Sequence, residues 1–189
     1  SVDQLPHHLV SLWLFGHKLM FPIPDIDRTD YFLMIGANPV ASNGSIWTVP
    51  DVRKRIKSLT ERGGQLVVID PRRTETAELA TEHHAARPGT DAALLLALIH
   101  LLFRDGLIDM GHLSDFVDGI DDIKKAVVSY TPEWAASHTG MSSEKITQIA
   151  HDFSSADRAI CYGRMGVSTQ RFGTLCQWAI QVINVLTDR

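Results

Sequence analysis

Two short runs of almost wholly apolar residues, Tyr31–Ile35 and Gln65–Ile69, stand out along the chain, with a segment of helical periodicity between them. A strand that is covered on both faces of a parallel sheet has this near-continuous apolar pattern. Residues 49–62 between the runs predict a basic amphipathic helix. A strand–helix–strand unit makes a right-handed crossover, so both strands end at the same edge of the sheet. In open α/β sheets, ligands bind at that edge.

Other segments extend this pattern into an α/β fold. The sequence predicts a short strand at 159–162 and helices that begin after Leu5 and Pro6, at Thr131 and at Met141, or cover 75–83, 92–103 and 177–186. Alternating strands and helices favour a doubly wound, mostly parallel sheet with helices on both faces. We expect one domain over 1–189, in which 1–30 is a lead-in helix and connector.

Composition narrows the class of protein. Hydrophobic residues make up 44% and charged residues 21% of the chain, which is ordinary for a globular protein. The net charge of −4 argues against general nucleic-acid binding, and no apolar run reaches the length of a membrane span. Cys161 and Cys176 lie in apolar segments without metal-binding spacing and are interpreted as buried packing residues. His7 and His8 could be metal ligands, but adjacent residues on a helix point in different directions, so they are predicted to be a solvent-exposed pair at a helix start.

The loop after the first apolar run has features of an anion site. Gly36 allows close approach of a ligand, and Asn38 is biased out of the helical region because Pro39 follows it. Ser42 begins a further group of small polar residues. Exposed backbone amides in such a loop can point at a phosphate or pyrophosphate. An ordinary strand-to-helix turn without a ligand explains the same residues equally well.

The loop after the second run carries more specific chemistry. Asp70 ends the strand where an acidic residue of a nucleotide-binding fold accepts hydrogen bonds from ribose hydroxyls. Arg72 and Arg73 offer donors to phosphate, and Thr74 and Thr76 are placed to cap the helix predicted next. The alternative is an Asp-Pro turn with two surface arginines.

A third segment leads into the helix at 92–103. Asp91 is placed to cap this helix, and Thr90 or Asp91 could equally face a ligand. A carboxylate can accept two hydrogen bonds from the N1–H and the amino group of guanine. Both interpretations of Asp91 remain open at this point.

Together, three motifs resemble a known family: GANP, VVIDPRRTETAELA and RPGTDAALLLALIH, in this order. They are similar to the bis-molybdopterin guanine dinucleotide oxidoreductases, which include dimethyl sulfoxide reductase, formate dehydrogenase and bacterial nitrate reductases. The segment YGRMGVSTQRFGTLCQWAIQVINVLTDR resembles the family's YGxGxxxQ region. The resemblance covers essentially the whole chain.

This resemblance implies a Rossmann-like domain that holds the guanosine and pyrophosphate of one molybdopterin guanine dinucleotide. Gly36, Asn38 and Pro39 would line the phosphate side, and Asp70 and Arg72 the ribose and base side. The other positions implied by motif match are Gly89, Thr90 and Asp91 at the guanine, and Gly163, Gly166, Ser168 and Gln170 near the pterin or the metal.

The parent protein would be a molybdenum or tungsten oxidoreductase that performs two-electron chemistry on a small substrate. Its metal-ligating residue and any iron–sulfur cluster would lie upstream of Ser1, and its carboxy-terminal cofactor-binding barrel after Arg189. We expect no catalytic residue and no metal site in this chain, which alone would be inactive. Its partners would be the cofactor and other domains of the parent, and a cytoplasmic location is expected unless the parent carries an export signal.

Two other classes stay open. A generic nucleotide-binding α/β domain fits the loops, although GxGxxG and GxxxxGK[ST] are both absent. An interaction domain that keeps the fold without a ligand is the other, since a fold does not determine function.

Overall fold

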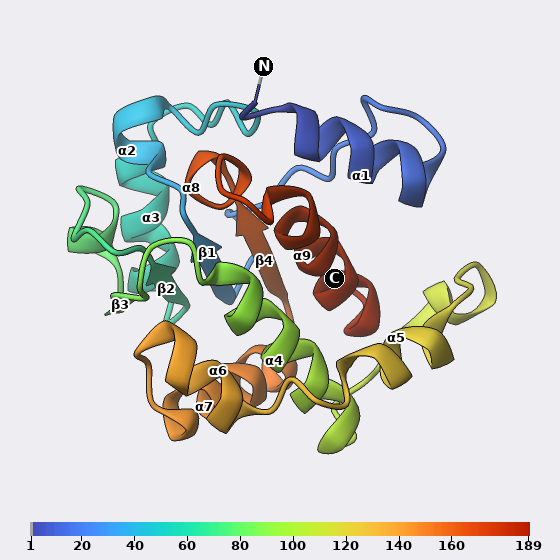
Figure 1. The fold of residues 1–189 in the computed structure, drawn as a ribbon. Helices are drawn as coiled ribbons and strands as arrows, with labels where there is room; N and C mark the ends of the chain where they lie inside the picture. Colours follow the sequence, from blue (N-terminus) through green and yellow to red (C-terminus); the bar gives the residue numbers. More distant parts are fainter. Residues whose placement is uncertain (1) are drawn as a thin grey trace.

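A computed structural model describes residues 2–189, and Ser1, the first residue of the predicted lead-in, lies outside the described residues. Within them, a four-stranded parallel sheet in the order β3-β2-β1-β4 is flanked by helices (Figure 1). Its strands are β1 (Tyr31–Ile35), β2 (Gln65–Ile69), β3 (Glu82–His84) and β4 (Ala159–Gly163). The predicted α/β class, with its parallel sheet, is confirmed.

Helices pack on both faces of the sheet. They are α1 (Leu5–Phe15), α2 (Pro39–Ser42), α3 (Val52–Glu61), α4 (Asp91–Arg104), α5 (Ile120–Val127), α6 (Pro132–Thr139), α7 (Ser143–Ser155), α8 (Met165–Ser168) and α9 (Gly173–Leu186), with 3-10 helices η1 (Ala77–Leu79) and η2 (Gly111–Asp115). Helices α4, α7 and α9 contribute to the core on one face, and α3 to the core on the other. The helix predicted over 49–62 is α3, which runs from Val52 to Glu61 in the structure.

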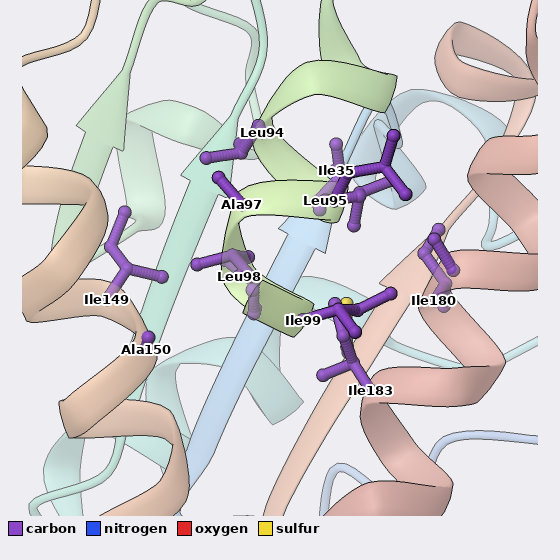
Figure 2. Close-up of a cluster of buried hydrophobic side chains, with 14 of the residues drawn as sticks. Ile35, Leu94, Leu95, Ala97, Leu98, Ile99, Ile149, Ala150, Ile180 and Ile183 are labelled. Atoms are coloured by element: carbon purple, nitrogen blue, oxygen red, sulfur yellow. The ribbon is translucent and has the colours of Figure 1, made fainter. Parts of the chain in front are cut away.

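Alternation along β1 explains why this strand is buried throughout. Leu33 and Ile35 belong to the α4-side core, whereas Phe32 and Met34 belong to the α3-side core, and all four are 0% exposed. Figure 2 shows the α4-side core, where Leu95 of α4 lies beside Ile35 and Ile99 lies beside Ile183 of α9. Successive strand residues point to opposite faces, so a strand covered on both sides must be apolar at every position.

One predicted helix is wrong. Residues 75–83 form the single 3-10 turn η1 and then the edge strand β3, which pairs in parallel with β2. Thr81 explains part of the difference, because its hydroxyl lies 3.0 Å from Leu66 N and 2.8 Å from Leu66 O and fixes the chain beside β2. The polar sequence of β3 gave no apolar strand signal.

Helix starts were more readily predicted. Thr131 Oγ1 accepts a hydrogen bond of 3.2 Å from Trp134 N, as expected of an N-cap. Pro132 follows at the first helical position, where its missing N–H is not needed. Among the described helices, none combines the length and the apolar character that crossing a membrane requires.

The β4 edge of the sheet is closed by a side chain of α9. Asn184 Oδ1 accepts a hydrogen bond of 2.8 Å from Cys161 N, and Asn184 Nδ2 donates one of 2.9 Å to Cys161 O. The amide thus makes the two bonds that a further strand would make to this residue. Asn184 is 4% exposed, so both strand groups are satisfied away from solvent.

We expect Asn184→Ala to destabilise the chain by about 2–4 kcal/mol, because two buried backbone groups lose their partners at a cost of about 1–3 kcal/mol each. Urea unfolding monitored by circular dichroism measures this change. Gln181→Ala, on the same helix, is the control and should cost clearly less. A loss below about 0.5 kcal/mol for Asn184→Ala would show that solvent replaces the amide.

Candidate functional site

The loops singled out in the sequence emerge at one edge of the sheet. Because β1, β2 and β4 are parallel, the loops after Ile35, Ile69 and Gly163 share the carboxyl edge. The chain runs from β1 to β2 on one side, whereas β4 pairs with β1 on the other, so the winding direction changes between β1 and β4. Such a switch point is where open α/β sheets bind ligands.

At the switch point, the loop after β1 and the loop after β4 are in backbone contact at Gly36 and Gly166. Gly166 N donates a hydrogen bond of 2.8 Å to Gly36 O. A Cβ at Gly36 would lie 2.7 Å from Val167 N, and one at Gly166 would lie 2.7 Å from Gly36 Cα. Gly36 also has a φ of +56°, which L side chains rarely adopt. Close packing of backbone thus explains both glycines.

Side chains join the loops that follow β1 and β2. Asn38 Oδ1 accepts a hydrogen bond of 2.7 Å from Thr76 Oγ1, and Asn38 Nδ2 donates one of 2.8 Å to Glu75 Oε2. Val40 N donates to Thr76 Oγ1 at 3.2 Å. Thr76 therefore does not cap a helix as predicted. Instead, Asn38 and Thr76 fix the two loops relative to each other, a role that the sequence alone did not indicate.

Asp70 is placed as an ordered, half-buried carboxylate at the end of β2. Its Oδ1 accepts a hydrogen bond of 2.9 Å from Arg72 N, which closes the turn, and its backbone O lies 2.9 Å from His83 Nε2. The side chain of Arg72 is exposed, with Nη2 3.6 Å from Glu75 Oε2. The loop therefore combines a fixed carboxylate with an exposed cation.

Two further polar residues of these loops, Thr74 and Ser42, support the turns themselves. Thr74 is 2% exposed and its Oγ1 accepts a hydrogen bond of 3.1 Å from Ala77 N, the first residue of η1. Ser42 Oγ donates to Asn38 O at 3.2 Å, and Pro39 is buried at the start of α2. Both hydroxyls are thus engaged in structural contacts.

The third and fourth loops meet at Asp91 and Gln170. Gln170 Nε2 donates a hydrogen bond of 2.6 Å to Asp91 Oδ2. Asp91 is the first residue of α4 and 9% exposed, and the N-cap is Thr90, whose side chain does not cap the helix and whose hydroxyl donates to Arg87 O at 2.6 Å. Gly89 has a φ of +78° and open space where a Cβ would be. The structure therefore directs the Asp91 carboxylate towards the β4 loop.

The Asp91 carboxyl of this pair has a raised pKa. Burial raises the pKa of the Asp91 carboxyl, the hydrogen bond from Gln170 partly offsets this rise, and the charge of Asp70 adds to it. Like charges disfavour each other's ionised form, so the Asp70 carboxylate makes ionisation of Asp91 harder. Gln170 Oε1 is buried and has no hydrogen-bond partner within the described chain. A hydrogen-bond donor that is not part of the described chain would satisfy this oxygen.

Ser168 belongs to an interior cluster with His7. Its hydroxyl donates to Arg164 O at 3.1 Å and accepts from Gln177 Nε2 at 2.9 Å, and it lies 3.5 Å from His7 Nδ1. His7 Nε2 lies 3.3 Å from Gly163 O. The predicted solvent-exposed histidine pair is therefore wrong for His7. Burial, followed by the charge of Arg164, lowers its pKa to about 4, so this imidazole is neutral near pH 7.

Arg164 is a residue that sequence reasoning missed. It is 5% exposed, and its guanidinium donates to Asp3 O at 3.0 Å and to Ser45 Oγ at 2.9 Å. It thus joins the β4 loop to the lead-in and to the loop after β1. An arginine directly after an apolar strand was the available signal. In the part of the chain that the structure describes, no group of three or more His, Cys, Asp or Glu side chains is arranged to hold a metal.

Comparison with a solved structure supports the fold, and comparison with protein families identifies the class of protein. Acetylene hydratase from Pelobacter acetylenicus superposes with a TM-score of 0.82 and 22% sequence identity over 96% of this chain and 24% of that one. A family model described as molybdopterin oxidoreductase matches residues 4–189. The chain belongs to the molybdopterin oxidoreductase family.

Individual relatives agree with this assignment. The chain is 32% identical over 168 residues to the F420-dependent formate dehydrogenase subunit alpha of Methanocaldococcus jannaschii, a match covering 86% of this chain and 24% of the relative. It is 33% identical over 146 residues to formate dehydrogenase H of Escherichia coli (77% and 20%). It is 28% identical over 185 residues to the dimethyl sulfoxide/trimethylamine N-oxide reductase of Cereibacter sphaeroides (93% and 22%). The chain thus spans less than a quarter of the length of these relatives.

The raised pKa of Asp91 gives a testable dependence of stability on pH. A carboxyl whose pKa is higher in the folded than in the unfolded state carries no penalty below its unfolded pKa, and the penalty grows as the pH rises through the folded pKa. We expect Asp91→Asn to gain stability relative to the unsubstituted chain between pH 4 and pH 7. Urea unfolding at both values measures the gain.

Asp122→Asn is the control, since the Asp122 side chain is 85% exposed. Its stability relative to the unsubstituted chain should change little with pH. A difference for Asp91→Asn that does not vary between pH 4 and pH 7 would contradict a buried, destabilised carboxylate at this position.

Proposed function

We propose that this chain is the domain of a larger molybdenum or tungsten oxidoreductase that holds the guanosine and pyrophosphate end of molybdopterin guanine dinucleotide. The observation that carries the proposal is the Asp91–Gln170 pair: a buried carboxylate with a raised pKa, bonded to an amide whose own oxygen has no partner among the described residues. Family membership supports a molybdopterin cofactor. The chemistry of this pair supports the guanine dinucleotide form.

The donors and acceptors of the site fit such a group. The Asp91 carboxylate is an acceptor for the N1–H and amino group of guanine, and Gln170 Oε1 is an acceptor for a further N–H of the cofactor. A buried acceptor without a partner costs about 1–3 kcal/mol, which a ligand donor would recover. Gly89 and Thr90 would lie beside the base, where Gly89 leaves open space.

On the β2 side, Asp70 would accept hydrogen bonds from the ribose, as the acidic residue at this position does in dinucleotide-binding folds. Arg72, which is exposed and held loosely by Glu75, would pair with phosphate. Asn38 and Thr76 would act as positioning residues, because their side chains already bond to each other. Gly163, Gly166 and Ser168 would shape the β4 loop near the pterin through backbone packing and the Ser168 cluster.

When bound, the metal and its pterins would supply two-electron redox chemistry on a small substrate. The contribution of this chain would be to bind and orient one end of that cofactor. His7 lies behind the β4 loop as a neutral imidazole, so it would add no positive charge there near pH 7. The domain alone would be inactive, and the substrate would be chosen by parts of the parent beyond these residues.

We expect the chain to bind GDP more tightly than IDP and IDP more tightly than ADP, measured by titration calorimetry up to millimolar nucleotide. IDP lacks the guanine amino group, so the first comparison isolates one of the two hydrogen bonds to Asp91. Hydrogen bonds to charged groups contribute about 1.5–3 kcal/mol, so Asp91→Asn should reduce the preference for GDP by roughly ten-fold or more.

Asp122→Asn, on the exposed surface of α5, is the matched control and should leave the order unchanged. In the full-length parent, the guanine content after acid release reports cofactor retention without an activity assay, and it should fall for Asp91→Asn. Preference for ADP would instead support a generic nucleotide-binding domain. No binding of any nucleotide, with full cofactor retention in the Asp91→Asn parent, would contradict the proposed role of Asp91.

A further inference from the structure

Exposed apolar side chains gather at one end of the molecule, on α1 and the turn that follows it. The residues concerned, called the α1 face from this point on, are Leu5, Leu12, Trp13, Leu19, Met20 and Ile23. Each is between 48% and 62% exposed. Soluble monomers rarely leave a large contiguous apolar patch in water, and those that exist mark interaction sites.

Helix α1 is mostly apolar, yet only one of its sides is covered. Its sequence, LPHHLVSLWLF, contains no Asp, Glu, Lys or Arg. Pro6, Val10 and Ser11 are buried, and the helix packs on α9, which lies beside it in Figure 1. Leu5 and Leu12 are seven residues apart and lie on the opposite side of the helix. Apolar side chains on the uncovered side of a helix are expected where that side packs against further protein.

The turn after α1 is held in place. Ser11 Oγ lies 2.6 Å from His17 O and 2.9 Å from Met20 O, and His8 Nδ1 lies 2.8 Å from Lys18 O. His8 also packs edge-on against Phe21 at 5.2 Å between ring centroids. These contacts fold residues 17–21 back along the helix. Leu19 and Met20 therefore extend the apolar surface of α1.

We propose that the α1 face is the docking surface for an apolar part of the parent polypeptide that lies outside these 189 residues. The length of the relatives supports this occupant, because the matched region covers only 20% to 24% of each of them. The composition of the helix supports it as well, since α1 carries no Asp, Glu, Lys or Arg with which a charged partner could pair. An apolar partner is required, because unpaired charges opposite these side chains would lose hydration without compensation.

The proposal extends the proposed function but is independent of the nucleotide chemistry. It requires a longer parent chain, not a guanine site. Failure of the GDP experiment therefore leaves it intact, and the reverse also holds.

Cysteine labelling tests the docking surface directly. Trp13→Cys is introduced into the 189-residue chain and into the full-length parent, and maleimide labelling of the peptide that carries residue 13 is followed by mass spectrometry. Native Cys161 and Cys176 are buried, and burial raises the pKa of the Cys176 thiol to about 12, so both should react slowly. Lys57→Cys, at an exposed position of α3, is the control.

We expect position 13 to be labelled at least ten-fold more slowly in the native parent than in the 189-residue chain, with both equal after denaturation in urea. Lys57→Cys should react at similar rates in both proteins. Equal native rates at position 13 would overturn the proposal. Protection in the 189-residue chain that increases with its concentration would also overturn it, because a second copy would then be the occupant.

A second variant guards against misfolding of the first. Leu12→Glu should leave the unfolding midpoint of the 189-residue chain within about 2 °C, since this side chain is 48% exposed there. The same substitution should lower the thermal midpoint of the parent by about 4 °C or more, because it would bury a charge at an apolar interface. An unchanged midpoint in the parent would contradict docking at this face.

Discussion

The parallel pairing of β1 with strands on both of its sides is the constraint on which the rest of the structure depends. Tyr31 aligns with Gln65 of β2 and with Ala159 of β4, and the register continues to Ile35, Ile69 and Gly163. The three strands therefore end level with one another. Loops that lie far apart in the sequence are brought together by this register alone, and the polar chemistry of the site follows from it.

Much of this arrangement was accessible from the sequence because burial leaves a simple pattern. A strand covered on both faces must be apolar at each position, which identified β1 and β2 from composition alone. The strand β3 could not be found in this way. Its sequence is Glu82-His83-His84, and it forms because Thr81 bonds to β2 and because His84 O accepts from Asp70 N at 3.2 Å. Such partners are distant in sequence and carry no local signal.

The candidate site shows the same division. Sequence reasoning singled out Asp70 and Asp91, and the structure places their carboxylates within electrostatic range of each other. Sequence reasoning did not reveal that both the oxygen and the nitrogen of the Asn38 side-chain amide are hydrogen-bonded, since Thr76 and Glu75 lie beyond α2, α3 and β2. Nor did it reveal the burial of His7, whose partners Gly163 and Ser168 are 156 and 161 residues away. Long-range partners are set by packing, and packing is a property of the whole chain.

The two edge strands of the sheet each carry a feature that disfavours pairing with a further strand. At one margin, Asn184 occupies the backbone groups of Cys161. At the other, β3 is three residues long, and the Glu82 carboxylate lies 3.2 Å from Lys145 Nζ and 2.8 Å from His84 Nε2. Short, charged or covered edges prevent strands of another molecule from adding to a sheet. The domain can therefore be concentrated, or joined covalently to further polypeptide, without its strands providing a template for amyloid-like growth.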